Sequence, residues 1–80
     1  MYLFNKTINK LLKTNVTIAT AESCTGGLLS YSFIKNKGVS KFFKTGLICY
    51  SNTSKIQLLK VKKNTLKKYG AVNHKTSKEM

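Results

Sequence analysis

Two short segments of this 80-residue chain carry side chains that could perform a hydrolytic reaction. The first contains Ser23, a candidate nucleophile, and the second contains Tyr50 and Lys55. A serine hydroxyl is a weak nucleophile and needs a neighbouring base. Because the chain offers no suitable histidine or second carboxylate, Lys55 is the plausible base, as in serine–lysine hydrolases. The lysine must be neutral to accept the proton, and burial or positive neighbours favour that form.

The turn around Ser23 offers further groups that could hold a substrate. The candidate substrate-binding residues are Glu22, Cys24, Thr25, Gly26 and Gly27 in this turn and Asn52 in the second segment. Backbone amides at a helix start lack intrahelical partners, so those at Gly26 and Gly27 could hold the oxyanion of a tetrahedral intermediate. The same helix start favours an anionic group such as a phosphate. Tyr50 could relay a proton or orient the serine–lysine pair.

The elements that must position these residues alternate between helix and strand. Apolar residues at helical spacing predict an amphipathic helix over 2–13, and a β-branched run predicts a strand over 16–20. A second helix is expected from Thr25 to about Lys37, and a second strand over 45–50. The near-continuous apolarity of the first strand suits a parallel sheet covered by helices. We therefore expect an α/β fold with a mostly parallel sheet and flanking helices.

Shorter helices are expected after the second strand, and their predicted features follow the chain. The first of them has its N-cap at Ser51 or Asn52 and turns Ile56, Leu58 and Leu59 toward the core. The second covers 65–69, is capped by Asn64 and ends at Gly70. A third begins after an N-cap at Thr76 or Ser77. In open α/β sheets, sites form beyond the carboxyl ends of strands, where helices begin. If the two strands are parallel neighbours, Ser23, Tyr50 and Lys55 converge on one rim of the sheet.

Simpler interpretations of the same residues stay open. Ser23 or Thr25 could only cap a helix, and Tyr50 could be an ordinary strand aromatic. Lys55 is one of fifteen lysines, and most lysines are solvated surface charges. A Thr-Gly-Gly sequence alone is a weak phosphate-binding signal, and it is not a Walker A loop.

The formal net charge of +13 comes from fifteen lysines, with no arginine in the chain. Arginine is favoured for bidentate recognition of phosphate and guanine, so a dedicated nucleic-acid binder is expected to use it. Charge of this kind speaks to solubility and non-specific binding rather than to fold. The use of lysine without arginine is therefore best explained by the codon bias of an A/T-rich genome, and we expect no nucleic-acid partner.

The cysteines and the single histidine predict neither a disulfide nor a metal site. Cys24 and Cys49 lack a Cys-x-x-Cys spacing, and two thiols do not make a zinc site. Each is expected to be a small buried residue beside a strand end, and His74 is expected at the surface or at a helix start. The chain resembles no signal peptide and has no apolar run near the roughly 20 residues that span a membrane. A cytoplasmic protein without a metal or cofactor is therefore expected.

Residues 20–28, Thr-Ala-Glu-Ser-Cys-Thr-Gly-Gly-Leu, closely resemble the signature of the CinA C-terminal domain, the nicotinamide-nucleotide amidohydrolase family. Further matching positions follow in order at 37–40, Phe43, 50–52, Lys55, 59–61 and 70–72. The resemblance covers nearly the whole chain from about Val16 onward. The sequence departs from the family at four places. The family usually has glycine where Thr45 and Lys60 stand, proline near Lys37, and serine near Asn73.

The resemblance implies a three-layer α/β/α fold and the deamidation of nicotinamide mononucleotide to nicotinic acid mononucleotide and ammonia, with no metal required. It assigns the nucleophile to Ser23, the active-site tyrosine to Tyr50 and the active-site lysine to Lys55. The family domain continues well beyond this length, with further strands and a second glycine-rich loop. We therefore expect residues 1–80 to form a partial domain, its N-terminal half, that is inactive alone.

The missing half leaves several hypotheses open. A separately encoded C-terminal half, or a homo-oligomer, could complete the site around a nucleotide substrate. Alternatively, the chain is a non-catalytic basic binding protein whose lysine-rich surface meets nucleic acid or another anionic surface. A third hypothesis is a decaying gene remnant that does not fold cooperatively.

Overall fold

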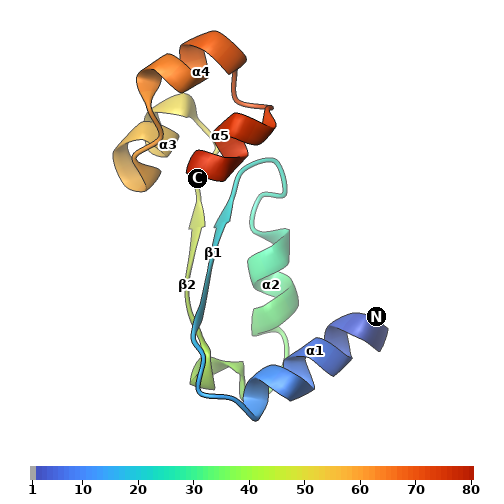
Figure 1. Cartoon of the computed structure of the whole chain (residues 1–80). Helices are drawn as coiled ribbons and strands as arrows, with labels where there is room; N and C mark the ends of the chain where they lie inside the picture. The colour runs from blue at the N-terminus through green and yellow to red at the C-terminus, as the bar shows by residue number, and fades with distance from the viewer. Residues whose placement is uncertain (1) are drawn as a thin grey trace.

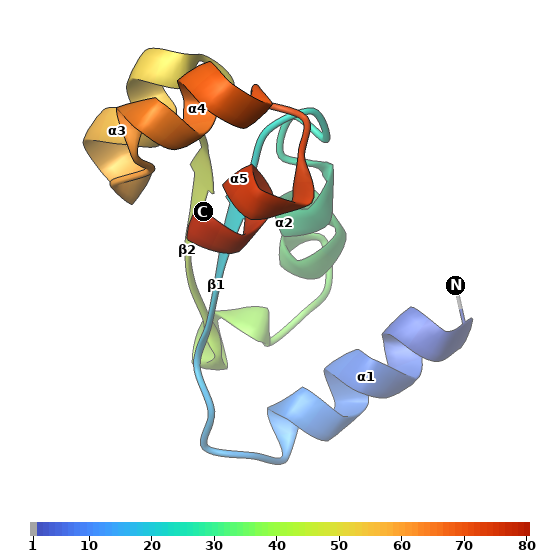
Figure 2. The same ribbon diagram turned by 45° about the horizontal axis from the view of Figure 1, so that its top comes forward.

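The computed structural model describes residues 2–80, without the side chains of Tyr2 and Leu3. Its elements are α1 (Tyr2–Leu12), β1 (Ile18–Glu22), α2 (Leu28–Ile34), the 3-10 helix η1 (Val39–Lys41), β2 (Phe43–Ile48), α3 (Asn52–Leu59), α4 (Lys63–Tyr69) and α5 (His74–Glu79). Figure 1 shows α2 running beside the strands, α1 near their amino ends and α3 to α5 beyond their carboxyl ends. In the turned view of Figure 2, α3 and α4 again lie beyond the carboxyl ends of the strands, and α5 crosses in front of those ends.

The two strands are parallel neighbours, as the order of elements predicts. Their register pairs Ala19 with Thr45 and Glu22 with Ile48. The register shifts after the Ile18–Phe43 pair. Because the strands run in the same direction, the segments that leave Glu22 and Ile48 start from the same edge of the sheet. This arrangement is the α/β fold expected from the sequence, with a two-stranded parallel sheet in the part of the chain that the structure describes.

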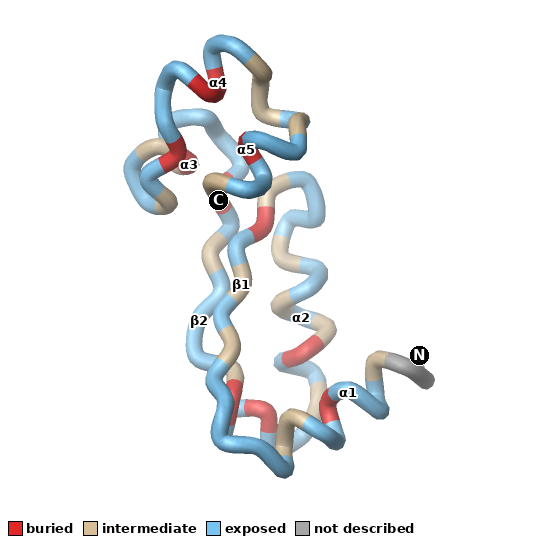
Figure 3. The backbone as a smooth tube through the Cα atoms, viewed as in Figure 1, coloured by how far each residue is buried: buried red, intermediate tan, exposed pale blue. Residues whose placement is uncertain are grey.

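The apolar core lies at the amino ends of the strands. Its buried residues are Ile8, Phe33, Val39 and Phe42, with Phe4, Leu11, Leu12, Ile18 and Phe43 packed against them. The Phe33 ring is central, with centroids 5.0 Å from Phe4, 6.1 Å from Phe42 and 5.7 Å from Phe43. Aromatic pairs at such separations add to the free energy that burial alone supplies. Figure 3 shows these buried positions where α1, α2 and η1 meet.

Helix α2 lies close to the sheet because small residues face each other across the contact. A Cβ placed on Gly46 would lie only 2.6 Å from Ser30 Oγ. Ser30 Oγ is also hydrogen-bonded to Thr20 Oγ1 at 2.6 Å. A larger side chain at Gly46 would therefore push the start of α2 away from β1 and β2.

At the carboxyl end, Val61 and Leu66 are buried, and several polar contacts help to fold the chain back on itself. Asn73 caps α5 by accepting from the Lys75 amide. Thr76 Oγ1, fully buried, donates to the Gly70 carbonyl at 2.7 Å. The Glu79 carboxylate accepts from the Lys62 amide at 2.9 Å and from Thr65 Oγ1 at 2.6 Å. These bonds hold α5 against α4 and return the chain toward the ends of the strands.

Several boundaries differ from the sequence prediction. The first strand occupies Ile18–Glu22 rather than 16–20, and the second Phe43–Ile48 rather than 45–50. Pairing begins where the Ile18 amide donates to the Phe42 carbonyl, and Phe43 joins the strand because its ring packs on Phe33. Tertiary contacts thus move both strands by two residues.

Two predicted caps are wrong, and one is confirmed. Asn64 lies inside α4, whose N-cap is Lys62, and Thr76 lies inside α5. The Thr76 hydroxyl is engaged elsewhere, since it donates to the Gly70 carbonyl, and Asn73 is the N-cap of α5. Ser51 is the N-cap of α3, where its hydroxyl accepts from the Ser54 amide.

The predicted burial of α3 and of the cysteines also needs correction. Leu58 is 57% exposed, while Lys55 is 1% exposed and is the buried residue of the helix. Cys49 is buried as expected, but Cys24 is exposed. His74 is exposed at the start of α5, in agreement with the prediction.

Within residues 2–80, every helix is too short or too polar to cross a membrane.

Candidate active site

The Ser23 turn connects the end of β1 to the start of α2. Gly26 and Gly27 adopt positive φ angles of 61° and 96°. Residues other than glycine rarely adopt such a conformation, because their Cβ atom clashes with the backbone. Gly27 also has no room for a side chain, because an added Cβ would lie 2.8 Å from Ile48 Cδ1. The turn is closed by a bond from the Gly26 amide to the Ser23 carbonyl. The two glycines therefore belong to the turn, and α2 begins after them, at Leu28.

Lys55 reaches the turn from the first part of α3. Its Nζ atom donates to Ser23 Oγ at 2.9 Å and to the Tyr50 carbonyl at 2.8 Å. The Ser51 cap places Lys55 one turn into the helix, where its amide bonds the Ser51 carbonyl. The structure thus joins Ser23 to Lys55, residues that are 32 positions apart in the chain.

The end of α3 secures Lys55 from the other side. Lys60 adopts a left-handed conformation with φ 61°. Among the described residues, all the others with a positive φ are glycines. The amides of Lys60 and Val61 bond the carbonyls of Ile56 and Lys55, respectively, as in a Schellman helix end. A glycine, which the resemblance noted in the sequence implies at position 60, would fit this backbone better than lysine does.

Tyr50 contributes to the site through its backbone. Its carbonyl oxygen accepts from Lys55, whereas its side chain is 74% exposed. Within the described residues, the phenol hydroxyl makes no hydrogen bond. A role for the hydroxyl as a proton relay therefore stays a prediction.

The Glu22 carboxylate does not face the site cavity. It is 4% exposed and accepts bonds from Thr25 Oγ1, the Leu29 amide, and both the amide and the hydroxyl of Ser30. Burial alone would raise the pKa of Glu22, but the bonds from Ser30, Thr25 and Leu29 outweigh it and lower the pKa to about 2. Glu22 is therefore ionised at neutral pH and belongs to the frame of α2.

Of the two amides expected to hold an oxyanion, those of Gly26 and Gly27, only that of Gly26 is engaged. The Gly26 amide bonds the Ser23 carbonyl, and the Leu28 amide bonds the Thr25 carbonyl. The next two amides of the helix bond Glu22. Among residues 2–80, the amides of Cys24, Thr25 and Gly27 make no hydrogen bond, so the donor expected at Gly27 remains available.

A cavity of about 400 Å³ contains Ser23 and Lys55. Cys24 and Tyr50 also line it, and its remaining wall comes from the C-terminal segment through Ala71, Val72, Asn73, Ser77 and Met80. The predicted binding residues Glu22, Thr25, Gly26, Gly27 and Asn52 are not among its lining residues. The C-terminal wall was missed by sequence reasoning, because its place depends on α5 folding back through Thr76 and Glu79.

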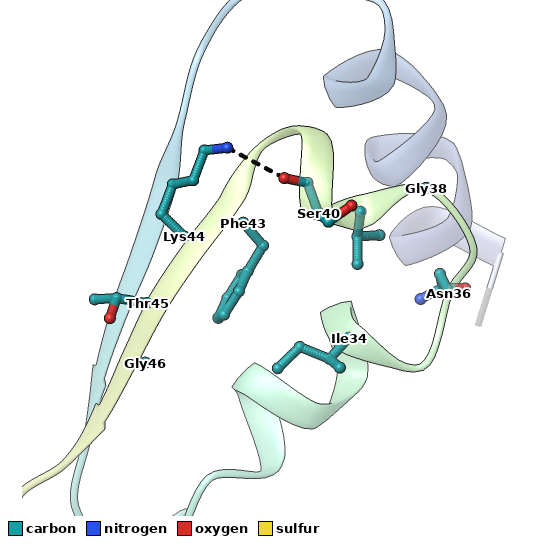
Figure 4. A pocket seen from close by; sticks show the side chains of 9 residues that line it. Ile34, Asn36, Gly38, Ser40, Phe43, Lys44, Thr45 and Gly46 are labelled. Carbon is teal, nitrogen blue, oxygen red and sulfur yellow. Dashed lines mark hydrogen bonds between the residues drawn. The ribbon is translucent and has the colours of Figure 1, made fainter.

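A second, wider hollow of about 550 Å³ lies at the amino end of the sheet (Figure 4). Its lining residues are Ile34, Asn36, Gly38, Val39, Ser40, Phe43, Lys44, Thr45 and Gly46. They include no acid, histidine or cysteine, and Lys44 Nζ is bonded to the Ser40 carbonyl at 3.2 Å. The smaller cavity, with a serine and a buried lysine in contact, is the candidate active site.

The described residues contain no group of three or more histidine, cysteine, aspartate or glutamate side chains that could hold a metal ion. The side chains that line the cavity include the Ser23 hydroxyl, the Lys55 amine and the free thiol of Cys24. This set suits nucleophilic attack on an acyl carbon.

Comparison with known proteins places the chain beside one group of proteins. Residues 2–80 match the CinA C-terminal domain. A competence-damage inducible protein of Clostridium novyi is 56% identical over 70 residues, which cover 88% of this chain and 17% of that protein. The chain thus spans less than a fifth of the length of that relative.

Solved structures of similar proteins have the same arrangement of elements. The competence/damage inducible protein CihA from Agrobacterium tumefaciens superposes with a TM-score of 0.93 at 33% identity, covering 99% of this chain and 48% of its own. A competence-damaged protein superfamily member from Escherichia coli gives a TM-score of 0.89 at 30% identity, with 96% and 45% coverage. The chain therefore corresponds to about half of each solved fold.

Proposed function

Because the chain belongs to the CinA C-terminal domain family, we propose that it carries the nucleophile half of a nicotinamide mononucleotide deamidase-like site. The observation that carries this proposal is the 2.9 Å contact between Ser23 Oγ and Lys55 Nζ in a cavity. A buried lysine that touches a serine hydroxyl is the geometry that a serine–lysine hydrolase requires.

The reaction follows from the positions of these groups. Lys55 acts as the base and takes the proton of Ser23 as the serine oxygen bonds to the carboxamide carbon of the substrate. The oxyanion that forms lies near the free amides of Cys24 and Thr25. The carbon–nitrogen bond then breaks, and Lys55 returns the proton to the departing ammonia. A water molecule next hydrolyses the acyl-serine, releasing the carboxylic acid and restoring Ser23.

The proposed activity requires the half of the fold that this chain does not span. The chain covers 48% of the Agrobacterium tumefaciens structure, and Tyr50 and Val72 at the cavity are 74% and 96% exposed. We expect the remaining half, on the same polypeptide or on another, to cover them and close the nucleotide pocket. The 80-residue chain alone is then expected to release no ammonia.

The test is an ammonia-release assay with nicotinamide mononucleotide, using the chain alone and mixed with the complementary half of a relative. The mixture is expected to be active, and Ser23→Ala or Lys55→Met to reduce its rate by a factor on the order of 10³ or more. Lys67→Met, which removes the same charge from an exposed position on α4, is the matched control and should retain activity. An active Ser23→Ala mixture would refute the nucleophile assignment.

The second hypothesis, a basic binding protein, has a weaker structural basis. Every lysine except Lys55 is exposed, and the exposed ones occur from α1 to α5 and in the connecting segments. A DNA affinity that falls steeply as salt rises would support this function, whereas indifference to DNA at physiological salt would remove it.

A further inference from the structure

The Glu22 carboxylate uses all its capacity to accept hydrogen bonds within the chain. A carboxylate offers about four acceptor directions, and four donors of the chain occupy them. Thr25 Oγ1 and the Leu29 amide each lie 2.8 Å from Oε1, while the Ser30 amide lies 3.0 Å from Oε2, which also accepts from the Ser30 hydroxyl. No acceptor direction is left for a substrate.

The backbone of Glu22 is hydrogen-bonded to the segment that leads to Tyr50. Its carbonyl accepts from the Cys49 amide at 2.8 Å. Cys49 is fully buried and directly precedes Tyr50, whose carbonyl holds Lys55 Nζ. One residue therefore fixes both the segment that carries the nucleophile and the segment that carries the carbonyl partner of the lysine.

Ser23 lies between two fixed points as a result. On one side Glu22 is bonded to α2 and to Cys49, the residue after β2, and on the other the Gly26 amide closes the turn on the Ser23 carbonyl. Thr25, in the middle of the turn, is bonded to the Glu22 carboxylate. The backbone of Ser23 is thereby held while its hydroxyl meets Lys55 Nζ.

We propose that Glu22 is the positioning residue of the site: its carboxylate locks the turn onto α2 so that Ser23 Oγ is held against Lys55 Nζ. The proposal rests on the proposed function for its chemical consequence, the reactivity of Ser23. Its geometric part, the effect of Glu22 on the serine–lysine contact, stands apart from any reaction. This role replaces the substrate contact expected for Glu22 from the sequence.

Glutamine is the informative substitution at this position. Glu22→Gln keeps the shape of the side chain, but its amide group has one acceptor oxygen and an NH₂ group that only donates. The NH₂ group would face the amide of Leu29 or of Ser30, which are donors themselves. At least one of these amides would lose its partner, and the turn would lose its attachment.

The experiment measures modification of Ser23 by phenylmethylsulfonyl fluoride in the whole chain, followed by peptide mass mapping. In this reaction the serine oxygen bonds to sulfur, fluoride leaves, and Lys55 takes the serine proton. Ser40, exposed near the other end of the sheet, is the internal reference for an unactivated serine. Glu22→Gln is expected to slow Ser23 modification by about tenfold or more, because small displacements of reacting groups have large effects on rate.

Two control variants separate positioning from charge and from stability. Asn9→Lys makes the same change of one positive unit in net charge at an exposed position of α1, away from the Ser23 turn. Val39→Ala destabilises the buried core at the amino end of the sheet. Both are expected to leave the Ser23 rate within about twofold of the parent while the chain remains folded.

A second readout follows the contact itself by NMR. The Lys55 side-chain amine, held by Ser23 and Tyr50, is expected to exchange its hydrogens slowly in the parent and faster in Glu22→Gln. A folded Glu22→Gln variant with parent-like Ser23 rate and amine exchange would overturn the positioning role. If Ser23 of the parent reacts no faster than Ser40, the proposed function fails, and the amine exchange alone decides the positioning role.

Discussion

The two ends of the sheet are built from different interactions. At the amino end, Phe33 and its aromatic neighbours form an apolar core. At the carboxyl end, the buried polar and charged residues are Glu22, Lys55, Thr65 and Thr76, each with hydrogen-bond partners. Apolar burial supplies most of the free energy of folding, whereas buried hydrogen bonds fix geometry and are costly when one partner is lost. The amino end is therefore expected to determine stability, and the carboxyl end to determine the site.

The largest expected effect is at the amino end. Phe33→Ala removes the ring that contacts Phe4, Phe42 and Phe43. Such a truncation reduces the free energy of unfolding by about 3–5 kcal/mol, which is comparable with the whole stability of a small domain. Thermal unfolding followed by circular dichroism should lose its cooperative transition. A cooperative transition that persists near the parent temperature would show that the core is elsewhere.

Acidification is expected to act on the carboxyl end. Hydrogen bonds from Ser30 and Thr25 outweigh burial and hold the pKa of Glu22 at about 2, and a bond from Thr65 lowers the pKa of Glu79. A carboxyl whose pKa is lower in the folded state stabilises the fold above its unfolded pKa, near 4.5 for Glu22, and that contribution disappears as the pH falls toward the folded value. The free energy of unfolding should therefore decrease between about pH 4.5 and pH 2.

Urea unfolding at a series of pH values measures this decrease. Glu22 and Glu79 are the only acidic side chains of the chain, so the double variant Glu22→Gln, Glu79→Gln should show a much smaller pH dependence. A parent and a double variant with equal acid sensitivity would contradict the assignment of these bonds. Exchange of the Leu29 and Ser30 amides in acid would locate the loss at the Ser23 turn.

The smallest expected effect concerns the end of α3. Lys60 has a φ of 61°, where a residue with a Cβ atom is strained by about 1 kcal/mol. Lys60→Gly should therefore raise the free energy of unfolding by up to about 1 kcal/mol, less the extra entropy that glycine gives the unfolded chain. Chemical denaturation measures the difference, with Lys62→Gly, at an extended position, as the control expected to destabilise. Destabilisation by both would mean that the left-handed helix end is not formed in solution.

Part of the fold could be predicted from the sequence because its signals are local. The glycine pair after Ser23, the serine before α3 and the glycine after α4 each mark a turn or a cap, and each is found there. The order of helices and strands predicted the parallel pair, since parallel strands need a crossover between them. The strand boundaries were displaced by two residues, because pairing and the packing of Phe43 on Phe33 decide where a strand begins.

What the sequence alone determined is that Ser23, Tyr50 and Lys55 follow strand ends and approach one edge of a parallel sheet. Only the tertiary structure decided which atoms meet there. It buried one lysine of fifteen beside Ser23, used Tyr50 through its carbonyl, and turned Glu22 away from the cavity toward α2. Side-chain identity fixes what a group can do, but burial and hydrogen-bond partners depend on residues distant in the chain. The C-terminal wall of the cavity shows the same dependence. Thr76 donates to a carbonyl 6 residues away, and Glu79 accepts from groups 14 and 17 residues away.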